Sequence, residues 1–300
     1  MRRMVRMIET GTATHAENAG FQLLNAAQPA FPVLISIPHS GRDYPPELID
    51  NLRVSPTDLM RLEDRYADRL VGPALAAGMT AIVAHRARAW IDLNRAEDDL
   101  DPEMVTPRID GYKSSNSMKM RGGLGLIPRR LMHVGDLWKR PLAADDIKRR
   151  LDQFHRPYHQ AIEQTLLNIR DRFGTAILVD VHSMPPLTAT ATQAPRIVIG
   201  DRFGQCAPAL YAEMLMARLK SLNVPAALNH PYPGDYILRR HGKTQGCIHA
   251  IQIEVDRSLY LDSMQREPGP GLESTASLIS ELLYCLVDLV SERAIPLAAE

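Results

Sequence analysis

Residues 33–41 read VLISIPHSG, a short apolar run that ends in a proline, a histidine, a serine and a glycine. The run is rich in branched aliphatic residues and too short for a helix, so it predicts a buried strand. A buried strand needs no ionisable ring at its end, and His39 therefore requires an explanation. On its own, a histidine at a strand end is more often a structural, hydrogen-bonded residue than a ligand. Its role depends on the residues at the ends of the other strands.

Similar apolar runs alternate with helical patterns along the rest of the chain. Strands that are apolar on both faces and separated by helices indicate a mostly parallel sheet with helices on both sides. The sequence therefore predicts a three-layer α/β fold in a single domain. Further strands are expected at residues 79–85, 87–95, 175–183, 196–200 and 247–256, and helices at residues 54–78, 143–174, 206–222 and 272–292.

Two of these helices carry boundary signals. Ser55 and Pro56 are typical of the cap and first turn of the helix at residues 54–78. Pro157 lies inside the helical pattern of residues 143–174, where it is expected to kink or divide the helix, because proline lacks the backbone N–H.

Two segments lack a sustained period. Residues 1–30 are interpreted as an N-terminal arm or an edge element, which leaves residues 31–300 for the α/β domain. Residues 95–130 are polar, punctuated by proline and glycine, and longer than a usual connection. Such a segment is typical of a lid or binding loop, or else of disorder.

Composition limits the function. Lysine plus arginine and aspartate plus glutamate both total 35 in 300 residues, so no net field attracts nucleic acid or a membrane. Three scattered cysteines argue against a disulfide framework and against a cysteine-built zinc site. No apolar run approaches membrane-spanning length, and the N-terminal residues lack the apolar core of a secretory signal. We expect a cytoplasmic protein that binds a small molecule. The sequence leaves its oligomeric state open, and a homo-oligomer is possible.

Polar side chains follow four of the predicted strands, at the edge where open α/β sheets bind ligands. Two strand-end histidines together with acids suit a divalent metal, and zinc with two histidines and one carboxylate leaves a fourth position for water. The side chains are His39; Asp92, Asn94 and Arg95; Asp180 and His182; and Glu254, Asp256 and Arg257.

Other constellations receive weaker interpretations. His155 and His159 have the i, i+4 spacing of helical metal ligands, but Pro157 lies between them. A packing role, or a role behind the metal ligands, is favoured for both. Ser40 and Ser183 lie outside a G-x-S-x-G motif, which argues against a serine hydrolase.

Seven motifs occur in order along residues 31–290: LISIPHSGRDYPPEL, EDRYADRL, DLNRAEDD, GLGLIP, LVDVHSMP, NHPYPGDYILRRHG and IQIEVDRSLYLD. Together they resemble the N-formylglutamate amidohydrolase family. That family is similar in architecture to the zinc carboxypeptidases and aspartoacylases, so the resemblance implies a zinc-exopeptidase-like αβα fold.

The resemblance implies roles for individual residues. His39 and His182 match the metal ligands, and Glu254 matches the general base. Asn94 and Arg95 would face the substrate carboxylate or the reaction oxyanion, where Arg95 would stabilise the developing charge.

The third metal ligand is harder to assign from the sequence. Carboxypeptidases place an acidic ligand three residues after the first histidine, and here that position is Arg42. Asp64 matches the family's acidic position, with Glu63 and Asp68 as alternatives; Asp68 lies one helical turn from Asp64.

The implied reaction is hydrolysis of N-formyl-L-glutamate to formate and L-glutamate, which the likeness connects with histidine breakdown. The substrate, N-formyl-L-glutamate, carries two carboxylates, which need at least two cations in the site. The candidates are Arg95, Arg257 and Arg121. The cofactor is expected to be Zn²⁺, although the ligand set also accepts Mn²⁺, Fe²⁺ or Co²⁺. Alternatives are hydrolysis of another N-acyl amino acid or small peptide, and a non-catalytic protein that binds a carboxylate.

Overall fold

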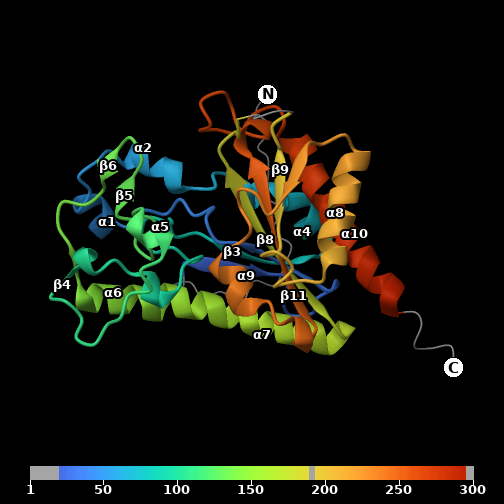
Figure 1. Ribbon diagram of the computed structural model, residues 1–300, viewed down its shortest axis with the longest axis horizontal. Coiled ribbons are helices and arrows are strands. Elements are labelled where there is room, and N and C mark those ends of the chain that lie inside the picture. The colour runs from blue at the N-terminus through green and yellow to red at the C-terminus, as the bar shows by residue number, and fades with distance from the viewer. Residues whose placement is uncertain (1–19, 189–192, 295–300) are drawn as a thin grey trace, which may run out of the picture.

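The computed structural model describes residues 20–188 and 193–294, so most of the predicted N-terminal arm lies outside the described residues. Seven strands of the described part form one sheet in the order β1-β3-β2-β8-β11-β9-β10 (Figure 1). Their bounds are β1 Phe21–Leu24, β2 Val33–Ile37, β3 Thr80–Ala84, β8 Ala176–Met184, β9 Ile197–Gly200, β10 Ala226–Leu228 and β11 Ile248–Asp256.

The sheet is mixed but mostly parallel. Strands β3, β2, β8 and β11 run parallel to one another, and β10 runs parallel to β9. Antiparallel pairing occurs where β1 meets β3 and where β9 meets β11. The predicted α/β fold is confirmed, and residues 21–24 form the edge strand of the sheet rather than a free arm.

Helices cover both faces of the sheet. One apolar core joins the sheet to α3, α4, α8 and α10, and a second joins it to α1, α2, α6, α7 and α9. The helices are α1 Pro46–Asp50, α2 Pro56–Leu59, α3 Ala67–Leu70, α4 Gly72–Ala76, α5 Met118–Arg121, α6 Ala144–Arg150, α7 Arg156–Phe173, α8 Ala209–Ser221, α9 Tyr236–His241 and α10 Leu272–Ala294.

The alternation of side chains along β8 determines which face carries the polar residues. Val179 and Val181 pack in the core with α8 and α10, whereas Leu178 packs in the core with α7. Because strand residues alternate in direction, Asp180 and His182 share the face of Leu178. The polar end of β8 therefore lies on the α7 side of the sheet.

The expected helix at residues 54–78 is wrong in its middle. Ser55 accepts a hydrogen bond from the Thr57 N–H and Pro56 opens α2, as predicted, but a 3₁₀ turn, Met60–Leu62, follows. The chain is then extended at Glu63 and left-handed at Tyr66 before α3 begins. Leucine spacing continues across the break, so periodicity could not reveal it.

The expected strand at residues 87–95 is also wrong. This segment has no strand partner; its backbone groups bind loops and side chains instead. The Asp92 N–H donates to the Leu126 carbonyl, and Arg150 donates to the Trp90 carbonyl while its guanidinium stacks over the indole ring. The apolar side chains of residues 87–95 are typical of a buried strand, but the segment forms no backbone pairing with another strand in the described part of the chain.

The long helix is divided just before Pro157, as predicted. A π-helical turn, Leu151–His155, joins α6 to α7, and Pro157 lies in the first turn of α7. A wider turn accommodates the missing proline N–H without ending the helix.

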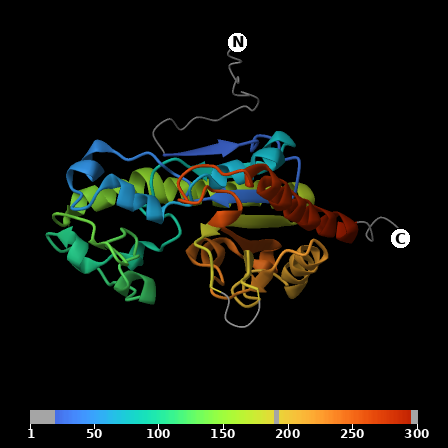
Figure 2. The same ribbon diagram turned by 90° about the horizontal axis from the view of Figure 1, so that it is seen from above.

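The segment at residues 95–130 forms loops and short elements beside the sheet (Figure 2). This segment and the residues that follow it, up to residue 143, also form two small strand pairs outside the main sheet, β4 with β7 and β5 with β6. The short elements are the 3₁₀ turns Glu97–Asp99 and Pro102–Met104, the helix α5, and the strands β4 Val105–Thr106, β5 Arg130–Leu131, β6 Gly135–Asp136 and β7 Leu142–Ala143.

Helix α10 differs from the expectation that no apolar run approaches membrane-spanning length. In the described part of the chain, Leu272–Ser291 is long and apolar enough to cross a membrane by length and composition. Half of this stretch is buried, however, and Ile279, Leu282 and Leu286 are fully buried against the sheet. Core helices of this kind meet the same criterion, so α10 is interpreted as a core helix.

A substitution in α10 tests this packing. Leu282→Ala is expected to lower the free energy of unfolding by about 2–5 kcal/mol, because it removes buried methyl groups and leaves a cavity. Asp288→Ala, at an exposed position of the same helix, should change it by no more than about 0.5 kcal/mol. Urea denaturation measures both; equal effects would contradict a packed α10.

Candidate metal centre and active site

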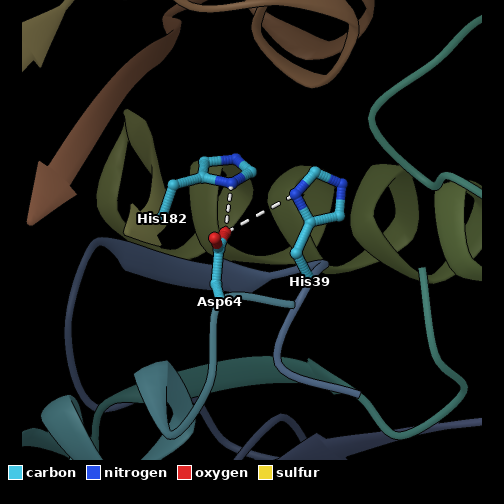
Figure 3. Close-up of side chains that lie close together, drawn as sticks. All are labelled: His39, Asp64 and His182. Carbon is cyan, nitrogen blue, oxygen red and sulfur yellow. Dashed lines mark hydrogen bonds and ion pairs between the residues drawn. The ribbon is translucent and has the colours of Figure 1, made fainter. Parts of the chain in front are cut away.

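Three buried side chains from separate parts of the chain meet at one point: His39, Asp64 and His182 (Figure 3). Oδ2 of Asp64 lies 2.9 Å from Nδ1 of His182 and 3.5 Å from Nδ1 of His39. Each residue offers one ligand atom, and these atoms lie within 4.8 Å of one another. We call these three residues the metal group.

Local structure explains how Asp64 reaches the two histidines. His39 lies just after the end of β2, and its carbonyl accepts a hydrogen bond from the Asp64 N–H at 2.9 Å. The break between α2 and α3 thus docks against the end of β2. At Gly41, a Cβ atom would lie 2.1 Å from the Arg86 carbonyl oxygen, so only glycine allows this close approach.

The outer nitrogen of each histidine is held by a second carboxylate. Nε2 of His39 lies 2.7 Å from Asp92, and Nε2 of His182 lies 2.8 Å from Asp180. Metal-binding histidines usually donate their second ring N–H to such a partner, which leaves the other nitrogen free to coordinate. Both Nδ1 atoms face Asp64, so the arrangement has the orientation that a ligand pair requires.

The buried carboxylates around the two histidines favour a positive charge in the site. Burial alone would raise the pKa of Asp64, but hydrogen bonds from His182 and His39 hold it well below its usual range. Burial likewise opposes a charge on His182, yet Asp180 and Asp64 raise its pKa well above the usual range. The carboxylates thus stabilise positive charge between the rings, which a proton or a metal ion can supply.

The donor set fits a divalent metal. Two imidazole nitrogens and one carboxylate oxygen are a common protein ligand set for zinc sites that keep an open position. All three residues are buried, and both histidines have their outer nitrogens held by carboxylates. The three residues could therefore hold a metal ion.

Glu254 lies beside the metal group on the neighbouring strand. It stands in register with His182, and its Oε1 accepts a hydrogen bond from the Gln252 amide at 3.0 Å. Burial raises the pKa of Glu254 to about 7, with Asp64 adding to the rise and His182 opposing it. A carboxyl group with this pKa can both accept and return a proton near neutral pH.

Asn94 borders the metal group. Its Nδ2 lies 3.3 Å from Nε2 of His182, and its Oδ1 accepts a hydrogen bond from the Ile237 N–H at 2.9 Å. Arg95 is buried and forms an ion pair with Asp235 at 3.0 Å, while its Nε donates to the Leu124 carbonyl. The guanidinium of Arg95 is therefore already paired with an acid.

The two other predicted arginines differ in position. Arg257 contacts the metal group, because its Nη2 lies 3.1 Å from Asp64 and its Nε donates to Ser183. Arg121 is exposed on α5, and its side chain makes no hydrogen bond or ion pair with the residues that the structure describes. Within the described ranges, no hydrogen bond or ion pair joins Arg121 to the metal group.

The alternative third ligands point elsewhere. Glu63 binds Arg65 at 2.7 Å and also accepts a hydrogen bond from Tyr44. Asp68 forms a bidentate pair with Arg42. Of the three acids considered, Asp64 alone faces the two histidines.

The remaining predicted residues form a support beneath the site. His155 Nε2 lies 2.7 Å from the Arg95 carbonyl oxygen, and His159 Nδ1 lies 2.9 Å from Nε2 of His241. Burial lowers the pKa of all three histidines, which keeps the rings neutral. His155 and His159 thus pack under the segment that carries Asn94, as expected for a role behind the site.

The serines offer no nucleophile arrangement. Ser40 donates to the Ala84 carbonyl, and Ser183 donates to Asp64 and accepts from Arg257. Neither hydroxyl has a histidine partner among the described residues.

Sequence reasoning missed three residues near the site. Arg88 donates to Asp92 at 2.8 Å, and the phenol of Tyr232 lies close enough to Glu254 for that charge, after burial, to raise its pKa. Lys119 on α5 is the third. The spacing of Arg88 four residues before Asp92 was the available signal, but residues 87–95 suggested a strand.

Known proteins resemble this chain over most of its length. A family model described as N-formylglutamate amidohydrolase matches residues 31–261. N-formylglutamate deformylases from Pseudomonas putida and Pseudomonas aeruginosa are 29% and 28% identical over 283 residues, or 91% of this chain and 98% of each relative. The crystal structure of N-formylglutamate amidohydrolase from Ralstonia eutropha JMP134 is 27% identical, with a TM-score of 0.84, over 91% of this chain and 99% of that one.

Metal content distinguishes Asp64 from its neighbour. Asp64→Asn should remove most bound zinc from the purified protein, because an amide oxygen is a far weaker ligand than a carboxylate. Asp68→Asn is the matched control, since it breaks only the pair with Arg42. Elemental analysis of both variants measures the effect, and equal zinc in the two would show that Asp64 is not a ligand.

Proposed function

The chain belongs to the N-formylglutamate amidohydrolase family, and we propose that it hydrolyses N-formyl-L-glutamate to formate and L-glutamate in a metal-dependent reaction. The observation that carries this proposal is the metal group with Glu254 in register beside it. A buried carboxyl group of near-neutral pKa next to two histidines and an acid is suited to hydrolysis of an unactivated amide. The match to the family supports N-formyl-L-glutamate as the amide.

His39, Asp64 and His182 would hold the metal, which we propose to be Zn²⁺, with Mn²⁺, Fe²⁺ or Co²⁺ as substitutes for this ligand set. When bound, the metal supplies a Lewis acid and makes water acidic enough to ionise near neutral pH. Asp92 and Asp180 hold the outer nitrogens of the histidines, so the rings need no reorientation during the reaction.

Glu254 moves the proton. It takes a proton from water as the water oxygen forms a bond to the formyl carbon. It then gives that proton to the amide nitrogen as the C–N bond breaks, so that glutamate leaves as an amine and formate remains. Without this transfer, the leaving group would be an amide anion, which is far too basic to depart.

The neighbouring polar residues bind and orient. Asn94 borders His182, and we assign Asn94 and Arg95 to the substrate carboxylate or the developing oxyanion. A preorganised donor of this kind contributes about 3–4 kcal/mol to transition-state stabilisation. Arg257 donates to Asp64, which supports a role in orienting that ligand in addition to substrate binding.

The biological setting is part of the proposal. Formate and glutamate are the products that the family likeness connects with histidine breakdown. The cysteines of the described residues are all free thiols, which fits the reducing cytoplasm that we propose as the compartment.

A substrate panel tests the proposed reaction. The zinc-loaded protein should release formate from N-formyl-L-glutamate with a higher kcat/KM than from N-formyl-L-aspartate, and should act poorly on N-acetyl-L-glutamate. Removal of the metal with a chelator should abolish turnover, and added Zn²⁺ should restore it. Activity confined to the acetylated compound would contradict the substrate, and no turnover on any compound would favour a non-catalytic carboxylate-binding protein.

A single substitution tests the base. Glu254→Gln should lower kcat by roughly 10²- to 10⁴-fold, the usual contribution of a positioned base, and should leave the zinc content unchanged. In the unsubstituted enzyme, kcat/KM should fall as pH drops below about 7, because protonation of Glu254 removes the base. The residual rate of the variant should lack this acid limb. Full activity in the variant would exclude Glu254 as the base.

A further inference from the structure

The proposed substrate brings two carboxylates into a site where most cations are already paired. Three arginines form ion pairs with acids within about 3 Å. Each such pair is close to neutral, so it attracts a further carboxylate only weakly. The pairs are Arg88–Asp92 at 2.8 Å, Arg95–Asp235 at 3.0 Å and Arg257–Asp64 at 3.1 Å.

Lys119 is connected to this group through the backbone. It lies on α5, whose first turn is capped by Ser117, the hydroxyl of which accepts from the Met120 N–H. The Lys119 carbonyl accepts from the Leu124 N–H at 2.8 Å, and the Leu124 carbonyl accepts from Arg95 Nε at 2.8 Å. Arg95 therefore fixes the turn that presents Lys119.

The ammonium group of Lys119 is unpaired within the part of the chain that the structure describes. It makes no hydrogen bond or ion pair with residues 20–188 or 193–294. The Lys119 side chain is exposed on α5. Partial desolvation and then repulsion by Arg95 lower its pKa, whereas Asp235 raises it. Lys119 is thus a cation beside the site whose charge no contacting acid neutralises.

We propose that Lys119 binds the side-chain carboxylate of the N-formyl amino acid and sets the preference for an acidic side chain. This inference rests on the proposed function. The α-carboxylate adjoins the carbon that carries the scissile amide, so it must lie near the metal group. The charged groups that act on Lys119 are Arg95, Asp235, Arg88 and Asp92, none of which belongs to the metal group.

The proposal places the side-chain carboxylate, at the far end of the substrate, against α5, which the Leu124 carbonyl connects to Arg95. A lysine suits this role because its flexible stem carries a compact charge. The proposal thus assigns to Lys119 the role that the sequence suggested for Arg121, which lies two residues further along α5.

The test compares N-formyl-L-glutamate with N-formyl-L-glutamine, which differs only in its neutral side-chain amide. In Lys119→Met, KM for the glutamate compound should rise roughly 10- to 100-fold, the effect of one charged hydrogen bond, while kcat changes little. Kinetics on the glutamine compound should stay nearly unchanged. Lys119→Arg should retain most of the preference, because it keeps the charge.

Lys113→Met is the matched control, since Lys113 is an exposed lysine of the same segment. Zinc content and thermal midpoint, measured for every variant, establish that each is folded. An unchanged ratio of kcat/KM between the two compounds in Lys119→Met would overturn the proposal. If the unsubstituted enzyme hydrolyses neither compound, the proposed function has failed instead, so the two failures are distinguishable.

Discussion

One carboxylate, Asp64, holds the candidate site together. Its backbone N–H binds the carbonyl of His39, and its side chain receives hydrogen bonds from His182, Ser183 and Arg257. Four parts of the chain, the end of β2, the break after α2, the end of β8 and the turn after β11, are thus fixed against one another. A carboxylate in this position remains ionised although it is buried, because the surrounding donors stabilise the charge.

The site separates acids that stay charged from one that titrates. A buried charge is tolerated when a partner compensates it, and Asp64 and Asp92 each have both a histidine and an arginine as partners. Among the described residues, Glu254 accepts a hydrogen bond only from the neutral amide of Gln252, and its pKa rises to about 7. The same buried face therefore contains rigid anions that orient histidines and one carboxyl group that is able to exchange protons.

The parts of this site that lie on strands were predictable from the sequence. A strand's period of two places Asp180 and His182 on one face, and the parallel sheet places Glu254 beside His182. The irregular parts were not predictable: leucine spacing continued through the break at Asp64, and residues 87–95 matched a strand although they form turns. In both segments, backbone groups bind distant residues, and no local pattern of side chains reports such contacts.

The irregular segment around Asn94 is nevertheless held from two sides. His155, at the end of the π-helical turn, binds the Arg95 carbonyl, and the first turn of α9 donates a backbone N–H to the Asn94 side chain. The Asn94 segment is therefore fixed by buried hydrogen bonds, as a preorganised site requires. Lys119, which we assign to substrate selection, instead lies on a short helix in the polar segment, where its side chain forms no hydrogen bond or ion pair with the described residues. Because surface segments tolerate substitution far better than buried networks do, a change at α5 can alter the substrate without disturbing the metal group.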